Sequence, residues 1–402
     1  MNLSTLQKDY FLAICSGFFL FILPFTHTVA IRLSFLLIAF IALMFIYPFK
    51  PLQKFPCKKI LLLWMLFPLL IIPFAWDINY SLNEIKVELG YSFMAFSLFF
   101  LLSYQKVFFI KSALFAAIFS LICVSLWGLW NSYWHDGIWL ETAQHNGSAS
   151  YISYTLILIP LLIFAYFLVS QYRSLIIAIA ALLIVTSFVS GQRIFVVALL
   201  AEMLIFIFWA KHSFNLNTKK LVFVSSIFIL LSMIFAVISL LNRFEGSIEA
   251  AIHYQQHDPR LALFSIPIDL IKNAPLIGYG FGRDTMLHVL GGKAVLEQIL
   301  STYPQGYQYS HAHNLLLNYA IEVGLVGLML FASVFICLFK YYYDSAKQSK
   351  LLVAVAGMVG MAILLGFLIR NQSNDMFYRD ISLFFWSIQG VLLGFIAKMT
   401  RI

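Results

Sequence analysis

Apolar residues fill this chain in long runs that recur from one end to the other. Each run of about 17 to 25 residues is long enough to cross a hydrocarbon core of roughly 30 Å as a helix. Backbone polar groups in lipid must be satisfied within the protein, which a helix achieves on its own. The pattern therefore predicts an all-α polytopic membrane protein. We expect twelve transmembrane helices, near residues 11–26, 30–48, 60–76, 88–104, 108–130, 151–170, 174–190, 193–210, 221–241, 314–339, 351–369 and 380–398.

Composition agrees with this pattern. The apolar fraction is 62% and the charged fraction is 11%, whereas soluble domains have about half and a quarter. No sizeable soluble domain is therefore expected. The first apolar run lacks a small-residue cleavage site, so we interpret it as a helix that stays in the protein. The four cysteines show neither metal-ligand spacing nor a disulfide framework, and we interpret them as packing residues.

The basic residues predict an orientation, because loops rich in Lys and Arg are retained in the cytoplasm. Most of them fall on one predicted side of the membrane, notably in residues 50–59, 211–220 and 340–350. Both termini are then cytoplasmic, as an even number of spans requires. We attribute the net charge of +9 to this topology and expect no nucleic-acid partner.

One outward segment, residues 242–313, is much longer than an ordinary connection, and such loops are usually functional or disordered. It contains apolar residues at helical spacing and the glycine-rich sequence GYGFG, which includes Gly280. We expect a large helical periplasmic loop that forms a cap, with a close backbone turn at the glycines. The predicted organisation is one membrane domain, with helices one to nine in 1–241, the cap in 242–313 and the last three helices in 314–402.

Ionisable residues at the predicted outer ends of the spans are candidates for function, because charge at membrane depth is costly. Arginine presents a fork of donors suited to phosphate, and histidine takes up a proton near neutral pH. Arginines near span ends can also simply anchor the protein to lipid headgroups, a reading that stays open for Arg283, Arg370 and Arg379. The candidates are Arg193, Arg260, His311, His313, Arg370, Asp375, Arg379 and Asp380.

Other polar groups are less informative. His311 and His313 lie two residues apart, and no neighbouring Cys or carboxylate completes a metal site, so we expect no metal. Glu202 and Glu322 fall inside apolar spans, where each is either a structural hydrogen-bond partner or a catalytic group.

From residue 186 onward the sequence resembles the O-antigen ligase and O-antigen polymerase superfamily of bacterial envelope enzymes. The resemblance rests on HAHNLLLNYAIEVGLVG, which carries His311, His313, Asn314 and Glu322. Weaker motifs are SGQR ending at Arg193, the Arg260-led segment before PLIGYGFG, and RNQSND…RD from Arg370. The last turn departs from the ligase pattern, because it retains the single acid Asp375 where an acidic pair is usual.

The resemblance implies a GT-C-like membrane glycosyltransferase of the inner membrane, with its active site facing the periplasm. Such ligases move O-antigen polysaccharide from undecaprenyl diphosphate to a sugar of the lipid A core, without metal, nucleotide or other cofactor. Carried over by position, Arg193 and Arg260 hold the diphosphate and His313 is the catalytic base. His311, Asn314, Glu322, Gly280, Arg370, Asp375 and Arg379 are possible supporting residues.

Two alternatives remain open. A polysaccharide polymerase uses the same lipid-linked donor with a different acceptor, and the motifs separate it only weakly from a ligase. A transporter or lipid flippase would place charges near the bilayer midplane and show repeat symmetry. This chain places most of its outward charges at the rim and shows no internal repeat.

Overall fold

The computed structural model describes residues 5–47, 55, 57–134, 147–190, 192–213, 249, 264–292 and 311–400. These residues form helices and connections, with no strand among them, which confirms the predicted all-α membrane fold. Eight of the described helices are long and apolar enough to cross a membrane. The total of twelve stays a prediction. The expected span 221–241, most of the cap and Arg260 lie outside the described residues.

Most helix positions match the apolar runs. The longer helices are α1 (Thr5–Ile22), α2 (Val29–Ile46), α3 (Lys58–Ile71), α5 (Tyr91–Gln105), α6 (Val107–Trp134), α7 (Gly147–Leu168), α8 (Arg173–Val189), α9 (Arg193–Ser213), α16 (Leu315–Ala346), α17 (Leu351–Arg370) and α18 (Arg379–Met399). Two short helices, α13 (Ser265–Asn273) and α14 (Thr285–Val289), precede α16.

The fourth span begins ten residues earlier than the predicted 88–104. Helix α4 (Ile78–Glu84) and the π-helix η3 (Ile85–Gly90) lead directly into α5. Asp77 starts α4, since its side chain accepts a hydrogen bond from the Tyr80 N–H at 2.9 Å. The polar residues of this stretch concealed the helix from the hydropathy pattern. Single-turn π-helices often occur at functional sites, and η3 carries the buried Glu88.

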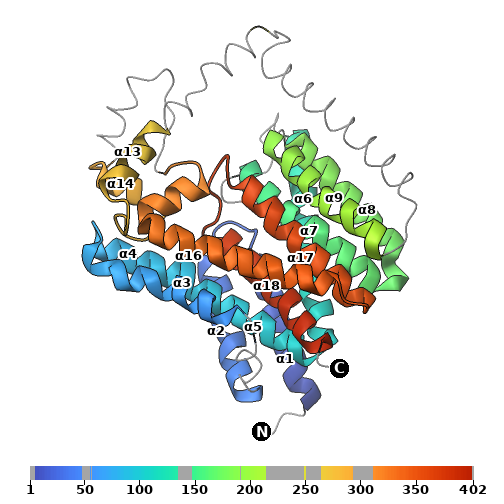
Figure 1. Cartoon of the computed structure of the whole chain (residues 1–402). Helices are drawn as coiled ribbons and strands as arrows, with labels where there is room; N and C mark the ends of the chain where they lie inside the picture. The colour runs from blue at the N-terminus through green and yellow to red at the C-terminus, as the bar shows by residue number, and fades with distance from the viewer. Residues whose placement is uncertain are drawn as a thin grey trace.

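The centre of the bundle is formed by α17 and α18, with α5, α7, α9 and α16 packed around them (Figure 1). Helix α18 lies very close to α5 at two glycines one helical turn apart. A Cβ at Gly390 would lie 2.5 Å from the Phe96 carbonyl oxygen, and one at Gly394 would lie 2.2 Å from that of Phe100. Small residues at this spacing let membrane helices approach backbone to backbone.

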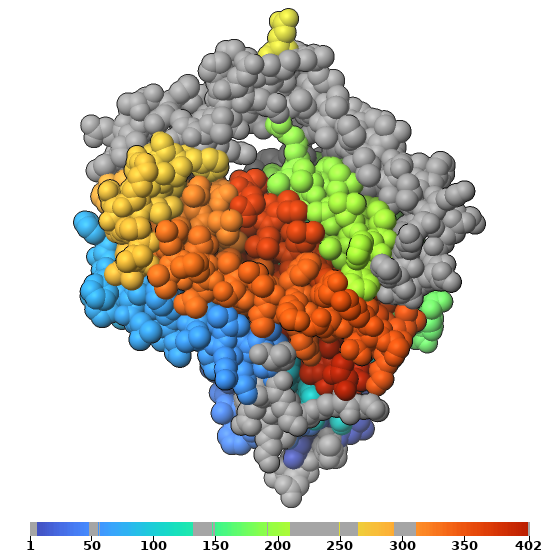
Figure 2. Space-filling model, viewed as in Figure 1, coloured from blue at the N-terminus to red at the C-terminus, as the bar shows by residue number. Residues whose placement is uncertain are grey.

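The two ends of the bundle differ in chemistry. At one end Lys106 forms an ion pair with Asp9, and Lys398 donates to the Gln105 carbonyl at 2.8 Å. These lysines belong to the side predicted to be cytoplasmic, so the structure brings them together. At the other end lie residues 371–378, between α17 and α18, together with α13 and α14, which pack on α16 (Figure 1). We call this second end the capped end. In Figure 2, residues 264–292 (yellow) lie on the surface beside α16 (orange).

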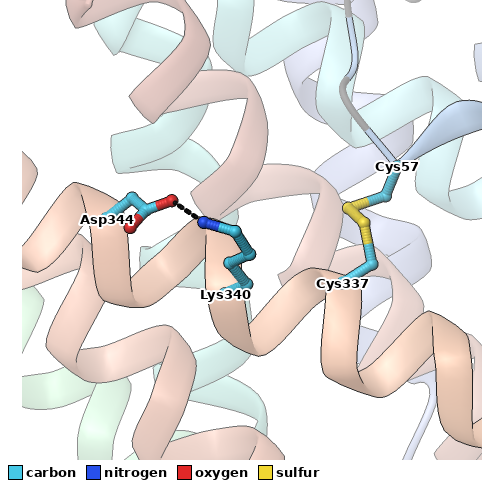
Figure 3. Close-up of a disulfide and its surroundings, with 4 residues drawn as sticks. All are labelled: Cys57, Cys337, Lys340 and Asp344. Carbon is cyan, nitrogen blue, oxygen red and sulfur yellow. Dashed lines mark hydrogen bonds and ion pairs between the residues drawn. A yellow bond between two sulfur atoms is a disulfide. The ribbon is translucent and has the colours of Figure 1, made fainter.

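The expectation that all cysteines serve only as packing residues is wrong. Cys57, directly before α3, and Cys337 in α16 form a disulfide with a Cα–Cα distance of 6.0 Å (Figure 3). The two residues are 280 positions apart. Sequence spacing cannot show such a pairing, because only the packing of α3 on α16 brings the residues together. Cys15 and Cys123 are free thiols.

Candidate active site at the capped end

Helix α16 begins at a tightly capped end. The Asn314 side chain accepts hydrogen bonds from the Leu316 and Leu317 N–H groups, at 3.0 and 3.1 Å. Its amide nitrogen donates to Oε1 of Gln372 at 3.0 Å. The side-chain oxygen thus satisfies donors that a helix leaves unpaired at its start. Asn314, expected as a supporting residue, joins the HAHN motif to the connection between α17 and α18.

Helix α16 is interrupted at Gly324, whose φ of +66° and ψ of −177° are not helical. The segment before α14 runs alongside the interruption and uses the freed backbone groups. The Gly280 N–H donates to the Glu322 carbonyl at 2.9 Å, and the Leu325 N–H donates to the Pro275 carbonyl at 2.8 Å. Backbone at membrane depth can leave helical form only where such partners exist. The PLIGYGFG motif is therefore attached to α16 beside its buried polar groups.

Gly280 has a structural reason to be glycine. Its φ is +117°, and a Cβ there would lie 2.6 Å from Oγ of Ser81 in α4. The glycine lets the segment pass between α4 and α16. Gly280 therefore allows this close approach, which agrees with the close backbone turn expected at the glycines.

Two buried carboxylates share one amide. Nδ2 of Asn318 donates to Oε1 of Glu322 at 2.6 Å and to Oδ2 of Asp375 at 3.0 Å. The second oxygen of Glu322 accepts from the Gly282 N–H at 3.3 Å, and that of Asp375 from the Phe377 N–H at 3.1 Å. Of the two roles left open for Glu322, these contacts favour the structural one.

Asp375 is the single acid retained in the last turn, and its side chain is buried. Burial raises the pKa of its carboxyl above the ordinary value, and the nearby positive charge of Arg283 acts in the opposite direction. Its partners are Asn318 in α16 and Phe377 in its own turn. Asp375 thus connects the final turn to α16.

Arg283 contacts His311 directly, so an anchoring role in lipid headgroups does not describe it. Its Nη2 lies 2.7 Å from Nε2 of His311, and its guanidinium lies 3.9 Å from the centre of the Tyr378 ring. A guanidinium can only donate, so Nε2 of His311 is the acceptor and Nδ1 carries the proton. Burial, and then the charge of Arg283, lower the pKa of His311 to about 2. His311 is therefore a neutral, fixed group.

His313 occupies a different environment. It is half-buried, and its ring lies 4.2 Å from that of His311 between centroids. Its φ is +51°, in the left-handed region that few residues other than glycine adopt. Such backbone strain tends to cluster at active sites, where surrounding contacts hold it. The structure thus places this histidine, predicted as the base, in a half-buried position two residues before α16.

A third buried acid lies nearby on η3. Both carboxylate oxygens of Glu88 accept from the Arg379 N–H, at 2.8 and 2.7 Å, and the Arg379 side chain reaches 4.0 Å from Glu84. Glu88, Glu322 and Asp375 line a cavity of about 20 Å³, room for about one water molecule. Arg379 thus has a defined role in joining α18 to η3.

Comparison with known protein families agrees with this arrangement. Residues 177–332 match the family described as O-antigen ligase. This part of the chain is thus similar to the O-antigen ligase family. The family supports a glycosyltransferase-like membrane enzyme with an O-antigen ligase or polymerase type of activity, and lipid-linked glycans as substrates. No curated protein matches the chain. The matched region includes Arg193, Arg260, His311, His313 and Glu322, and it ends before Asp375.

Of the two arginines predicted to hold the diphosphate, Arg193 lies within the described residues and Arg260 lies outside them. Arg193 is the half-buried first residue of α9, and its side chain makes no ion pair or hydrogen bond among the described residues. Arg370 is 1% exposed, and its Nη2 donates to the Ala149 carbonyl at the start of α7, at 3.0 Å. This depth does not fit headgroup anchoring. Asp380 accepts from the Tyr154 hydroxyl at 2.8 Å, inside the bundle.

Sequence reasoning missed three residues of the site, namely Asn318, Glu88 and Tyr378. Asn318 lies four residues before Glu322, the spacing that places two side chains on one helix face. That spacing was the available signal for Asn318. Glu88 had no comparable signal, because its partner Arg379 is 291 residues away.

Proposed function

We propose that this protein is an O-antigen ligase that transfers polysaccharide from undecaprenyl diphosphate to a sugar of the lipid A core. The observation that carries the proposal is the environment of His313, a half-buried histidine beside a neutral His311 that Arg283 holds. This environment lies at the capped end of the bundle. It suits an enzyme that deprotonates an acceptor hydroxyl at a membrane surface.

The two histidines are suited to different roles. Nε2 of His311 is occupied by Arg283, and its pKa of about 2 leaves it no capacity to accept a proton near neutral pH. His313 is therefore the proposed base. Arg193 and Arg260 are proposed to hold the donor diphosphate, because their planar donor forks match phosphate oxygens and stay charged.

The proposed transfer is a displacement at the anomeric carbon of the donor glycan. His313 takes the proton of the acceptor hydroxyl while the hydroxyl oxygen forms a bond to the anomeric carbon. The bond between that carbon and the diphosphate oxygen breaks, and the diphosphate leaves with the electron pair. The arginines stabilise the charge that develops on it. This scheme needs no metal, nucleotide or other cofactor, so purified enzyme is expected to turn over in excess chelator without added nucleotide.

We further propose that the protein lies in the bacterial inner membrane, with both termini in the cytoplasm and the capped end in the periplasm. Residues 242–313 would form the periplasmic cap between helices in 1–241 and 314–402. Besides the donor and the lipid A-core acceptor, its expected partners are membrane lipids. Cysteine labelling that reaches residues 264–292 only from the cytoplasm would contradict this orientation.

A polymerase acting on the same donor is the principal alternative, and a transporter or flippase is the other. The deciding experiment is the lipopolysaccharide profile of a deletion strain. Core-only lipopolysaccharide together with long carrier-linked chains supports the ligase. Core bearing a single repeat supports the polymerase, and loss of chains from the outer side of the membrane supports transport.

A further inference from the structure

Asn318 has hydrogen bonds to three separate segments of the capped end. Its Nδ2 lies 2.6 Å from Glu322, 3.0 Å from Asp375 and 3.3 Å from the Arg283 carbonyl. Its Oδ1 accepts from the Ala312 N–H at 3.3 Å. The side chain is 1% exposed. One buried amide therefore links the α17–α18 connection, the segment after GYGFG and the peptide between the two histidines.

Only an amide fits this position well. It offers two donor hydrogens to the carboxylates of Glu322 and Asp375, and an acceptor to a backbone N–H. An aliphatic side chain of similar size would leave both carboxylates without this donor in a buried place, where unpaired polar groups are costly. An aspartate would add a third acid beside two others, and like charges this close disfavour ionisation.

The bond to Ala312 matters because the next residue is His313. The φ of His313 is +51°, a conformation that surrounding contacts must maintain. Asn318 holds the peptide on one side of the histidine pair, and Arg283 holds the His311 ring on the other. Arg283 in turn presents its own carbonyl to Asn318. The three contacts form a closed frame around residues 311–313.

We propose that Asn318 is a positioning residue for glycosyl transfer, which fixes the backbone of residues 311–313 relative to Arg283 and Asp375. This inference rests on the proposed function, because it gives the frame the task of aiming His313. Asn318 does not touch substrate in this scheme. It acts through the peptide bond between His311 and Ala312, one residue before the base.

The test compares Asn318→Leu and Asn318→Asp with a matched pair at Gln389. Gln389 is also a fully buried amide, and its oxygen accepts from the Tyr342 hydroxyl at 2.7 Å near the opposite end of α16. Gln389→Leu and Gln389→Glu therefore reproduce the same chemical changes away from the site. For each variant, kcat, KM for donor and acceptor, and the thermal midpoint are measured with purified protein.

We expect Asn318→Leu to lower kcat by about 10²-fold, the order of loss that a displacement of about 1 Å causes at a catalytic group. The KM for the donor should change little, since the arginines bind the diphosphate. Gln389→Leu should keep its kcat even where its thermal midpoint falls. Equal kcat losses in the two Leu variants, or normal kcat in Asn318→Leu, would overturn the inference.

Asn318→Asp provides a readout that a merely structural role would not move. Its new carboxyl would face Glu322, Asp375, Glu88 and Arg283, so it can donate only when protonated. Its activity should therefore recover partly as the pH falls, whereas Gln389→Glu should follow the wild-type pH profile. A pH profile of Asn318→Asp that parallels the wild type would contradict the proposal. This variant keeps the side-chain shape and serves if Asn318→Leu does not fold.

A second readout needs no glycan substrate. His311 is buried and bonded through Nε2, so diethyl pyrocarbonate should modify it slowly in the wild type. Peptide mass spectrometry should show at least several-fold faster modification in Asn318→Leu or Asn318→Asp. Wild-type protein that transfers no glycan would refute the ligase, whereas unchanged histidine reactivity in the variants would refute the positioning role.

Discussion

Arg283 and His311 are joined side chain to side chain, with Nη2 of the arginine 2.7 Å from Nε2 of the histidine. The arginine comes from the segment after GYGFG, and the histidine from the turn before α16. The bond sets the histidine tautomer, because the guanidinium remains a donor at every relevant pH. It also keeps a second ring beside that of His313, at 4.2 Å between centroids. A residue that sequence alone left as a possible headgroup anchor thus belongs to the candidate site.

Arg283→Ala should lower transfer by about 10²-fold, because the frame around the histidines loses one side and misplacement of about 1 Å has that effect. Arg283→Lys should recover activity only partly, since an ammonium lacks the planar fork that bonds His311 and lies on the Tyr378 ring. Turnover with lipid-linked donor measures both variants. Lys272→Ala, which removes an exposed cation of α13, is the control. Full activity in Arg283→Ala would show that its contact with His311 has no part in transfer.

His311 should make the protein less stable as the pH falls below about 6.5. Its pKa is about 2 in the folded chain and near 6.5 when unfolded, so between these values the unfolded chain binds the extra proton. At full effect, the free energy of unfolding falls by about 1.4 kcal/mol for each unit that the pH falls. The raised pKa of Asp375 acts in the opposite direction, so the comparison is between wild type and His311→Gln. If the prediction holds, the thermal midpoints of the wild type and His311→Gln should converge or cross as the pH is lowered from 7.5 to 4.5. A constant difference would contradict it.

Much of the fold follows from hydropathy alone. The α8–α9 pair, separated by a very tight turn, lies where the apolar runs place it. Lys106 and Lys398, both predicted on the same side of the membrane, do lie at the same end of the bundle. Hydropathy failed at α4 and η3, because the asparagines, glutamates and lysine of this stretch interrupt the apolar pattern.

The site was harder to predict, since its contacts cross long distances in sequence. Family motifs identified His311, Glu322 and Asp375 separately, but not that Asn318 joins the two acids. The Cys57–Cys337 disulfide likewise depends on packing that no spacing reveals. Local patterns give helices and candidate residues, whereas pairings between distant residues need the folded structure.

Gly324→Ala should destabilise the protein and abolish transfer. The glycine has a φ of +66°, and an added Cβ would lie 2.2 Å from the Leu276 carbonyl oxygen. Strain at such a φ and the backbone clash both disturb the backbone contacts between residues 275–280 and α16. Gly17→Ala is the matched control, because its new Cβ would make ordinary contact with Ser112 at 3.5 Å. Similar thermal midpoints and activities in the two variants would contradict the role of the interruption.

The Cys57–Cys337 disulfide should be detectable by mass spectrometry of unreduced peptides, and its loss should lower the thermal midpoint. Removing a disulfide costs up to about 5 kcal/mol, with long closed loops at the upper end in the entropic account. Cys337→Ser is compared with Cys123→Ser, which changes a free thiol. The predicted orientation argues against this disulfide, because residues 50–59 are expected in the cytoplasm, where disulfides are rare. Two alkylatable thiols at these positions in membranes from growing cells would show the reduced form there.

His313 is the proposed base, and its backbone conformation determines how it should be tested. At a φ of +51° an alanine adds strain to the loss of the imidazole, whereas asparagine tolerates this region better than most residues. His313→Asn therefore removes the base while keeping the turn. We expect it to slow the transfer step by about 10² to 10⁴-fold, the usual contribution of a general base. Donor binding should remain, because the arginines hold the diphosphate. His311→Gln, which keeps an acceptor for Arg283, should lose much less. Single-turnover rates and donor affinity separate these effects. Near-normal turnover in His313→Asn, or loss of donor binding, would remove His313 from the chemistry and leave it a structural part of the turn.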